Sequence, residues 1–409
     1  MKEELLVSYA KLIAASGANI QQGQYVIIYT SVEQEYFTSL LVKECYNLGA
    51  KRVLVEWSSR LVKRVNYECG EKEELSKLLP QEEEFHKFMV DNLPVRIFLE
   101  DTDPDELSGL DSKKIGSILQ SRMTQIKKYR SQIENKHQWV IAGVPSIKWS
   151  RKVFPNAKSD KQALELMWKA ILKTARAERG KGINNWKKHD RNLKKRCKFL
   201  NSLKLANLHY TSKNGTDLTV GLIPGVIFLG GGEKTINGIY FQPNIPSEEV
   251  FTSPMKGKAE GVVYASKPLV YQGQLIENFY LKFHEGKVVE VHAKKGQDVL
   301  EHIIEIDEGS SYLGECAFVP FDSPINNTNL LFYSTLFDEN AACHLAIGRG
   351  FTNLYPKFEK YTEEKLHSFG INDSASHVDF MIGTADLNVI GTTVDGKKIE
   401  IFKDGNWAF

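Results

Sequence analysis

The chain has 409 residues, of which 42% are hydrophobic and 25% charged, a composition typical of an ordinary soluble globular protein. It excludes a disordered or fibrous chain, and the length predicts two or three domains that need no disulfide or metal to form a core. The net charge of +2 gives no general attraction to nucleic acids or membranes.

The start of the chain carries apolar residues at helical spacing after two acids. We therefore expect an amphipathic first helix, with neither a signal peptide nor a membrane span. The five cysteines are scattered and show no CxxC spacing, which favours a cytoplasmic protein in a reducing compartment.

Up to about residue 205, short apolar runs alternate with longer segments of helical spacing. The runs are typical of strands buried on both faces. They cover residues 25–29, 52–57, 95–99 and 139–143, and the helical segments cover 32–48, 82–92, 112–136 and a stretch around 164–171. This alternation predicts an α/β N-terminal domain with a mostly parallel sheet over residues 1–204.

Lysine and arginine dominate residues 177–200. A nucleic-acid groove would need aromatic residues among these cations, and Trp186 offers little of that pattern. We therefore favour a solvated helix that bridges two domains and expect no nucleic-acid partner.

Beyond residue 205, short strands separated by turn residues dominate. The predicted strands cover 206–210, 218–222, 261–265, 279–283, 288–293 and 398–402. Asn214-Gly215 and Asp395-Gly396 are hairpin signals, and Glu285-Gly286 is a weaker one. With a helix expected near 339–348, residues 205–409 predict a mainly antiparallel α+β C-terminal domain.

Standard HExxH, GxSxG and phosphate-loop motifs are missing. Instead, four segments of the second half place carboxylates or imidazoles among apolar residues. These segments are 244–252, 312–320, 338–346 and 377–383. Buried acids are normally paired or bound to a cation, so the four segments point to a metal site. A capping glutamate, a core histidine and ordinary salt bridges are the structural alternatives.

Local spacing supports two half-sites. On a strand, His377 and Asp379 would project from the same face because the side-chain period is two. Glu339 would lie in the turn that leads into a helix and His344 on the helix itself, with both side chains aimed at one point.

In this order, the four segments resemble the aminopeptidase T and aminopeptidase S family of metallopeptidases, the thermophilic metalloprotease family. The resemblance implies two divalent metal ions, Zn²⁺, Co²⁺ or Mn²⁺, in the C-terminal domain, with Glu315 bridging them. The implied ligands are Glu249, Glu315, His344, His377 and Asp379, with Glu339 as a weaker candidate for a ligand or an outer group.

The resemblance further implies a metalloaminopeptidase that hydrolyses the N-terminal peptide bond of short peptides with water activated by two metals. Glu315 would act in catalysis, and a metal, Glu248 or Glu339 would bind the free amine of the substrate. Arg349 and Phe351 would contact the substrate. A homodimer is implied, and we expect residues 1–204 to gate the site and make dimer contacts.

The chain departs from the family at one position. Phe351 stands where the family carries an active-site tyrosine, seven residues after His344, and it has no hydroxyl to exchange a proton. Tyr355 could supply that hydroxyl. The alternatives are a non-catalytic metal-containing protein that binds peptides or nucleic acids and lost turnover through Phe351, or a dinuclear hydrolase of other amides or phosphoesters.

Overall fold

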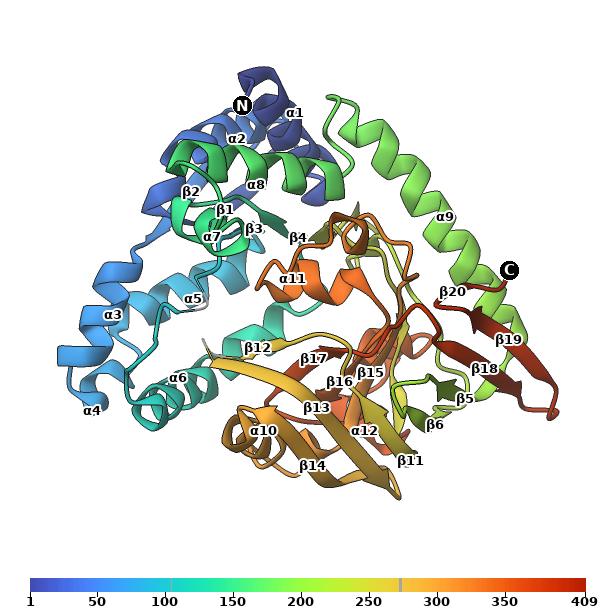
Figure 1. Ribbon diagram of the computed structural model, residues 1–409. Helices are drawn as coiled ribbons and strands as arrows, with labels where there is room; N and C mark the ends of the chain where they lie inside the picture. The colour runs from blue at the N-terminus through green and yellow to red at the C-terminus, as the bar shows by residue number, and fades with distance from the viewer. Residues whose placement is uncertain (104, 272–273) are drawn as a thin grey trace. The chain divides into compact units, whose positions relative to one another are not determined.

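The computed structural model describes residues 1–103, 105–271 and 274–409 (Figure 1). The chain divides into two compact units. The first comprises Met1–Lys187 and Gly232–Ile245, and the second comprises Lys188–Gly231 and Pro246–Phe409. The division falls inside helix α9 (Gly182–Leu203), earlier than the boundary after residue 204 that the sequence suggested. The first unit is also discontinuous, because residues 232–245 return to it.

A parallel five-stranded sheet forms the centre of the first unit. Its order is β2-β1-β3-β4-β9, and every pairing within it is parallel. The strands are β1 (Tyr25–Ser31), β2 (Arg52–Ser58), β3 (Val95–Glu100), β4 (Trp139–Gly143) and β9 (Asn244–Ile245). The predicted α/β layer is therefore confirmed, and β9 explains why a distant segment belongs to this unit: it supplies the fifth strand.

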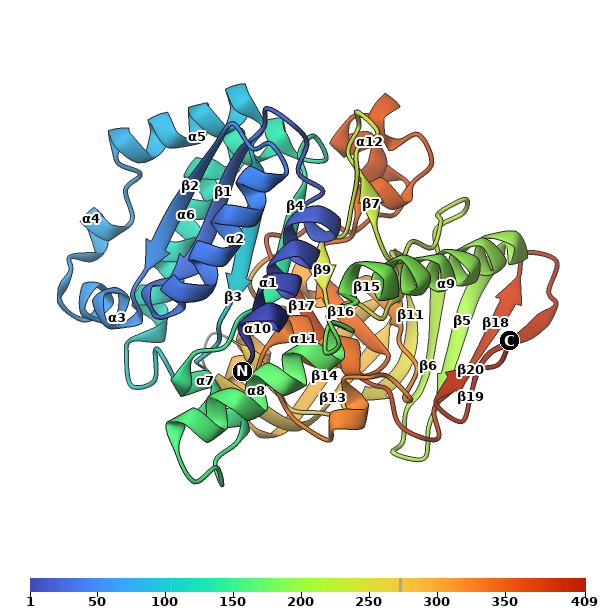
Figure 2. The ribbon, with the colours of Figure 1, turned by 90° about the horizontal axis from the view of Figure 1, so that it is seen from above.

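Helices cover both faces of this sheet. Figure 2 shows α1 and α2 on one face and α5 and α6 on the other. The helices are α1 (Glu3–Leu12), α2 (Glu35–Asn47), α3 (Arg60–Cys69), α4 (Lys72–Leu75), α5 (Pro80–Asn92), α6 (Ser112–Ile133), α7 (Ile147–Val153) and α8 (Asp160–Thr174). Because both faces are covered, the middle of β1 is apolar without alternation, and Val26, Ile27 and Ile28 are fully buried.

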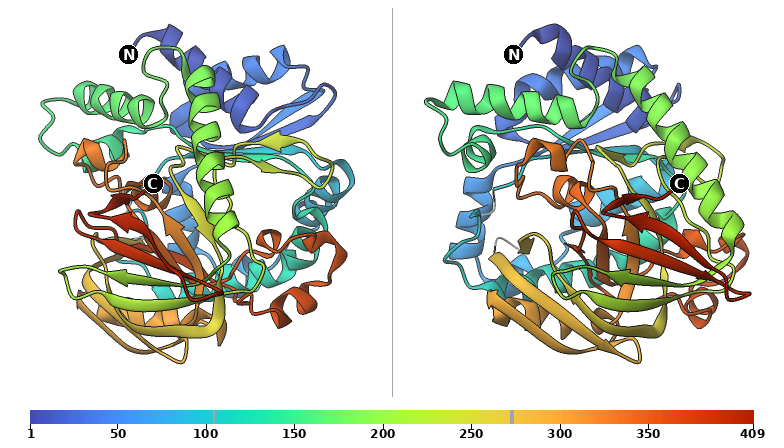
Figure 3. Two further views of the ribbon diagram at one scale, coloured as in Figure 1. Left: turned by 90° about the vertical axis from the view of Figure 1, so that its right-hand side faces the viewer. Right: turned by 45° about the vertical axis from the view of Figure 1, so that its right-hand side comes forward.

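The second unit is built on a large antiparallel sheet, whose green, gold and red strands lie side by side in Figure 3. Its order is β12-β13-β11-β6-β5-β18-β19-β20, with β14 paired to β13. The strands are β5 (Leu205–Thr211), β6 (Asp217–Leu222), β11 (Pro254–Tyr264), β12 (Leu269–Tyr271), β13 (Gln274–His284), β14 (Lys287–Lys295), β18 (Asn388–Thr393), β19 (Lys398–Lys403) and β20 (Asn406–Trp407). All three predicted turns join antiparallel neighbours in this sheet.

A smaller antiparallel sheet packs in the core of the second unit. Its order is β10-β15-β16-β17, with β10 (Val250–Thr252), β15 (Leu313–Phe318), β16 (His344–Gly348) and β17 (His377–Met381). The predicted helix over 339–348 is wrong. Residues Glu339–Ala341 form one 3₁₀ turn and the rest is β16. A short apolar run fits a buried strand as well as a helix, and pairing on both edges with β15 and β17 decides for the strand.

The remaining elements are short and complete the two units. They are β7 (Glu233–Lys234), β8 (Tyr240–Phe241), α10 (Gln297–Ile304), α11 (Thr335–Asp338) and α12 (Glu363–Ser368). Among the described residues, no helix combines the length and apolarity that crossing a membrane requires. In the basic segment, Trp186 is buried and its Nε1 donates to the carbonyl of Ala175 at 2.7 Å, so the indole is a core group.

Candidate metal centre

The small sheet brings all four predicted segments together, because each of them contributes one of its strands. Glu315 on β15 and Asp379 on β17 both lie opposite Ala346 of the central strand β16. His377 lies opposite Gly348. Because the central strand carries small residues at these positions, the larger side chains of the outer strands can converge over it. Glu249 comes from the first segment, 244–252, and lies immediately before β10.

Two groups of potential ligand atoms result. One oxygen or nitrogen from each of Glu249, Glu315 and His344 lies within 4.8 Å of the others, and the same holds for Glu315, His377 and Asp379. His344 Nε2 is 3.3 Å from Glu249 Oε2, and His377 Nε2 is 3.1 Å from Glu315 Oε2 and 3.2 Å from Asp379 Oδ1. The five residues singled out from the sequence therefore meet in space, and Glu315 belongs to both groups.

Burial perturbs the protonation of this cluster. Glu315 is 4% exposed, and burial raises the pKa of its carboxyl to about 7 against the opposing hydrogen bond from His377. Burial lowers the pKa of His344, but the bond to Glu249 and the surrounding carboxylates outweigh it and raise that pKa to about 10. Both shifts favour bound protons, whose positive charge offsets the negative charge of the clustered carboxylates. A bound cation would offset the same negative charge.

The donor set fits a divalent transition metal. Carboxylate oxygens and imidazole nitrogens suit Zn²⁺, Co²⁺ or Mn²⁺. His377 Nδ1 donates to the carbonyl of Arg349 at 2.7 Å and His344 Nδ1 to that of Ala342 at 3.3 Å, which leaves each Nε2 directed at the carboxylates. Metal-binding histidines typically donate through their second nitrogen in this way. Asp379 Oδ1 is buried, and its one close polar neighbour named above, His377 Nε2 at 3.2 Å, does not meet it in good hydrogen-bond geometry, so this oxygen is available to a cation.

Glycine at position 314 is required by the close approach of two strands. A Cβ there would lie 2.3 Å from the carbonyl oxygen of Arg349 and 2.4 Å from that of Gly348. The carbonyl of Arg349 is also the acceptor for His377. Gly314 thus lets β15 approach the backbone that orients a predicted ligand.

The two other predicted carboxylates lie beside the cluster. Burial raises the pKa of Glu339 well above its usual range, and the charges of Asp379 and Glu249 raise it further. Glu248 Oε2 is 3.7 Å from His189 Nε2.

His189 and Asn340 were not singled out from the sequence. Asn340 could have been found from the sequence, since it lies inside the 338–346 segment. Nothing in the sequence pointed to His189, because its hydrogen-bond partner, the carbonyl of Ser247, is distant in the chain.

Phe351 lies directly against a predicted ligand. Its ring centroid is 5.1 Å from that of His377 and 5.4 Å from that of Phe251. Tyr355 instead stacks on Phe369 at 4.6 Å and contacts Tyr361. The guanidinium of Arg349 lies 3.9 Å from Glu363.

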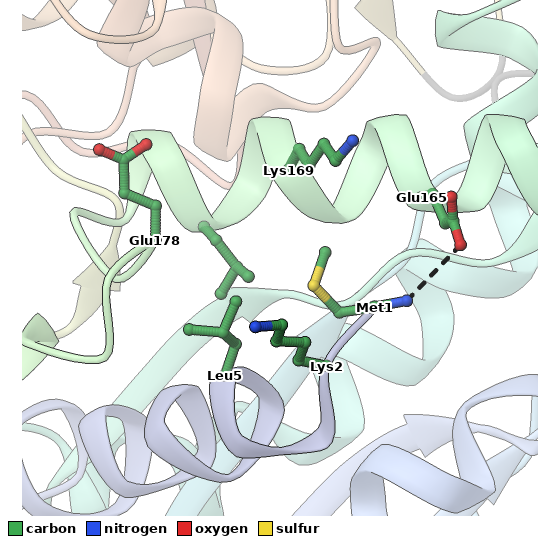
Figure 4. Close-up of a pocket in the computed structure, with 7 residues that line it drawn as sticks. Met1, Lys2, Leu5, Glu165, Lys169 and Glu178 are labelled. Atoms are coloured by element: carbon green, nitrogen blue, oxygen red, sulfur yellow. Dashed lines mark ion pairs between the residues drawn. The ribbon is translucent and has the colours of Figure 1, made fainter.

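A separate cavity of about 580 Å³ lies between α1 and α8 in the first unit (Figure 4). Its charged side chains comprise two lysines and two glutamates, and the amino group of Met1 is 3.7 Å from Glu165 Oε1. None of the predicted metal ligands lines it.

Comparisons with known proteins point the same way as this geometry. A family model described as thermophilic metalloprotease (M29) matches residues 2–407. Aminopeptidase AmpS of Bacillus subtilis (strain 168) is 41% identical over 405 residues, covering 99% of this chain and 98% of that protein. Aminopeptidase T of Thermus aquaticus is 34% identical, covering 99% and 98%. The solved structure of wild-type AmpT from Thermus thermophilus has a TM-score of 0.90 at 34% identity and covers all of both chains.

Proposed function

The chain belongs to the thermophilic metalloprotease family M29 and is a metal-dependent aminopeptidase, and from that premise we propose that two divalent ions act at the candidate centre. Glu249 and His344 would hold one ion, His377 and Asp379 the other, and Glu315 both. The observation that supports this assignment is the sharing of Glu315 by the two groups of ligand atoms. The ions would be Zn²⁺, Co²⁺ or Mn²⁺, which suit carboxylate and imidazole donors.

Divalent ions bound there would polarise the scissile carbonyl and make water a nucleophile near neutral pH. The chain's own groups would position the peptide and handle protons. Glu339 Oε1 accepts from the side chain of Asn340 at 3.3 Å, which leaves Oε2 to exchange a proton. Burial and the nearby carboxylates raise the pKa of Glu339 well above its usual range, so this group holds a proton more tightly than an ordinary glutamate does, which suits that role.

Recognition of the substrate's free amine would use a carboxylate at the edge of the centre. Glu248 and Glu339 are both buried. Glu248 would pair with the ammonium group, and Glu339 would do so only when ionised. Arg349 and Phe351 would contact the rest of the peptide. A free amine paired in this way would also exclude internal peptide bonds.

The function is tested by loading chelator-stripped protein with Zn²⁺, Co²⁺ or Mn²⁺ and supplying free and N-acetylated peptides of two to ten residues. We expect metal-restored release of the N-terminal amino acid from the free peptides only, with short peptides preferred. Glu315→Gln should lower kcat/KM by more than the roughly 100-fold that loss of an outer partner can cost, and Glu308→Gln, an exposed control, should not. Metal binding without release from any peptide would contradict a catalytic role.

We also propose that the enzyme is a homodimer and that the first unit contributes contacts between copies and limits access to the site. Helix α3 follows the edge strand β2 and has no buried residue, while Leu61 is 70% exposed and Val62 and Val65 are more than half exposed. Such an apolar stripe beside a sheet edge marks an interaction surface. Light scattering of Leu61→Glu/Val65→Glu should show a monomer, with Val289→Glu on β14 as the exposed control.

The cytoplasm is the proposed location. All five cysteines are free thiols and four of them are buried. Thiols in this state are typical of a reducing compartment.

A further inference from the structure

One peptide group in the second unit is held at both ends by buried side chains. The carbonyl oxygen of Ser247 accepts from His189 Nε2 at 2.7 Å. The amide of Glu248 donates to Asn340 Oδ1, also at 2.7 Å. The carbonyl and the amide belong to the same planar peptide unit, so its orientation is fixed from two sides.

The two side chains that hold this peptide are themselves well determined. His189 is 8% exposed and Asn340 is fully buried. A carbonyl can only accept, so His189 Nε2 carries the hydrogen. The amide nitrogen of Asn340 donates to the carbonyl of Leu336 at 3.0 Å, which directs Oδ1 towards Glu248.

The held peptide joins Ser247 to Glu248, and the next residue in the chain is Glu249, a proposed ligand. Its carbonyl also lies close to Gly230, where a Cβ would be 2.6 Å away. The backbone on both sides of Glu249 is therefore constrained, and its side chain reaches 3.3 Å from His344 Nε2. Without the constraint, rotation of the peptide would move the Glu249 carboxylate out of the group it shares with His344 and Glu315.

We infer that His189 and Asn340 are positioning residues that fix Glu249 for metal binding. This inference rests on the proposed function and assigns a role to two residues outside the predicted ligand set. Outer partners of metal ligands typically contribute 10- to 100-fold in affinity, because a ligand that must be ordered on binding loses that entropy. The same range is expected here.

The test measures the affinity of chelator-stripped full-length protein for Zn²⁺ by competition with a chromophoric chelator. In His189→Gln the side-chain amide nitrogen reaches the Nε2 position, whereas in His189→Asn it stops short. We expect His189→Asn and Asn340→Leu to weaken the affinity roughly 10- to 100-fold, and His189→Gln to stay within about threefold of the wild type. The double variant His189→Asn/Asn340→Leu should bind Zn²⁺ only slightly less tightly than the single variant with the lower affinity, because both side chains hold the same peptide.

Asn201→Leu is the matched control. Asn201 also lies on α9, and its side chain accepts from the amide of Phe228 at 2.7 Å and donates to the carbonyl of Phe228 at 3.0 Å. Its loss should lower the melting temperature and leave Zn²⁺ affinity unchanged. The inference would be overturned, with the proposed function intact, by either of two results. One is a loss of Zn²⁺ affinity in Asn201→Leu as large as in His189→Asn and Asn340→Leu, and the other is wild-type affinity in both of those variants. If Asn340→Leu does not fold, the comparison of His189→Gln with His189→Asn decides. A wild type that binds no metal would overturn the proposed function as well.

Discussion

At the scale of single residues, Phe351 separates this chain from the pattern its family resemblance implies. The ring of Phe351 contacts that of His377 and therefore lies beside the candidate metal centre, although it carries no hydroxyl. Proton transfer by a positioned hydroxyl typically contributes about 10²- to 10⁴-fold to a rate. Tyr355 is the substitute we proposed from the sequence, and its role needs a direct test.

Replacing Tyr355 with phenylalanine removes only the hydroxyl, because the ring contacts with Phe369 and Tyr361 can persist. If Tyr355 serves the reaction, we expect kcat to fall by at least about tenfold while KM changes little. Steady-state kinetics with a free tripeptide would measure both. Phe351→Tyr in the same background should recover activity, and an unchanged kcat in Tyr355→Phe would remove Tyr355 from the mechanism.

At the scale of secondary structure elements, one buried histidine between a helix and a strand makes the stability of the first unit depend on pH. His137 lies between α6 and β4 and is buried. Its Nδ1 donates to the carbonyl of Ile133 at 2.9 Å, and its Nε2 accepts from Arg96 Nε of β3 at 2.8 Å. Burial, followed by the positive charge of Arg96, lowers the pKa of His137 to about 4.

This contact predicts a loss of stability in acid. Between pH 6.5 and pH 4 the unfolded chain binds a proton at His137 that the folded chain does not, so the free energy of unfolding falls as the pH falls. The lost contribution is up to about 3 kcal/mol. Urea unfolding at pH 7 and pH 4.5 should show a smaller acid loss in His137→Gln than in the wild type. His302→Gln, an exposed position on α10, should lose as much as the wild type.

At the scale of the whole molecule, the candidate metal centre couples the stability of the fold to pH. The folded state without metal holds extra protons, because the pKa of Glu315 is raised to about 7 and that of His344 to about 10. A raised pKa in the folded state means that stability falls as the pH rises, through 4.5 to 7 for Glu315 and 6.5 to 10 for His344.

We therefore expect the free energy of unfolding of chelator-treated protein to fall by on the order of several kcal/mol between pH 5 and pH 9. Its melting temperature should fall over the same range. Metal displaces these protons, so its affinity and its stabilising effect should grow over the same range. Scanning calorimetry of stripped and loaded protein across this range measures the difference. If the difference in melting temperature between loaded and stripped protein became smaller as the pH rises, the proposed ligands would be contradicted.

Much of this protein follows from local sequence. The β-branched runs of the first unit and the Asn-Gly and Asp-Gly turns of the second depend on backbone preferences and burial within a few residues, so the strands they predict are present. The four segments that carry the proposed ligands could also be singled out, because each places charged or imidazole groups among apolar residues. The family resemblance then implied which of these groups would bind metal.

The tertiary structure decided what local sequence could not. His344 lies on a strand because β15 and β17 pair with both of its edges, and pairing between distant segments is invisible in a short apolar run. The fifth strand of the first sheet and the contact of His189 with Ser247 likewise join residues far apart in the chain. The sequence by itself therefore determined which residue types are available for metal chemistry, whereas only long-range packing decided which of them meet and what holds them there.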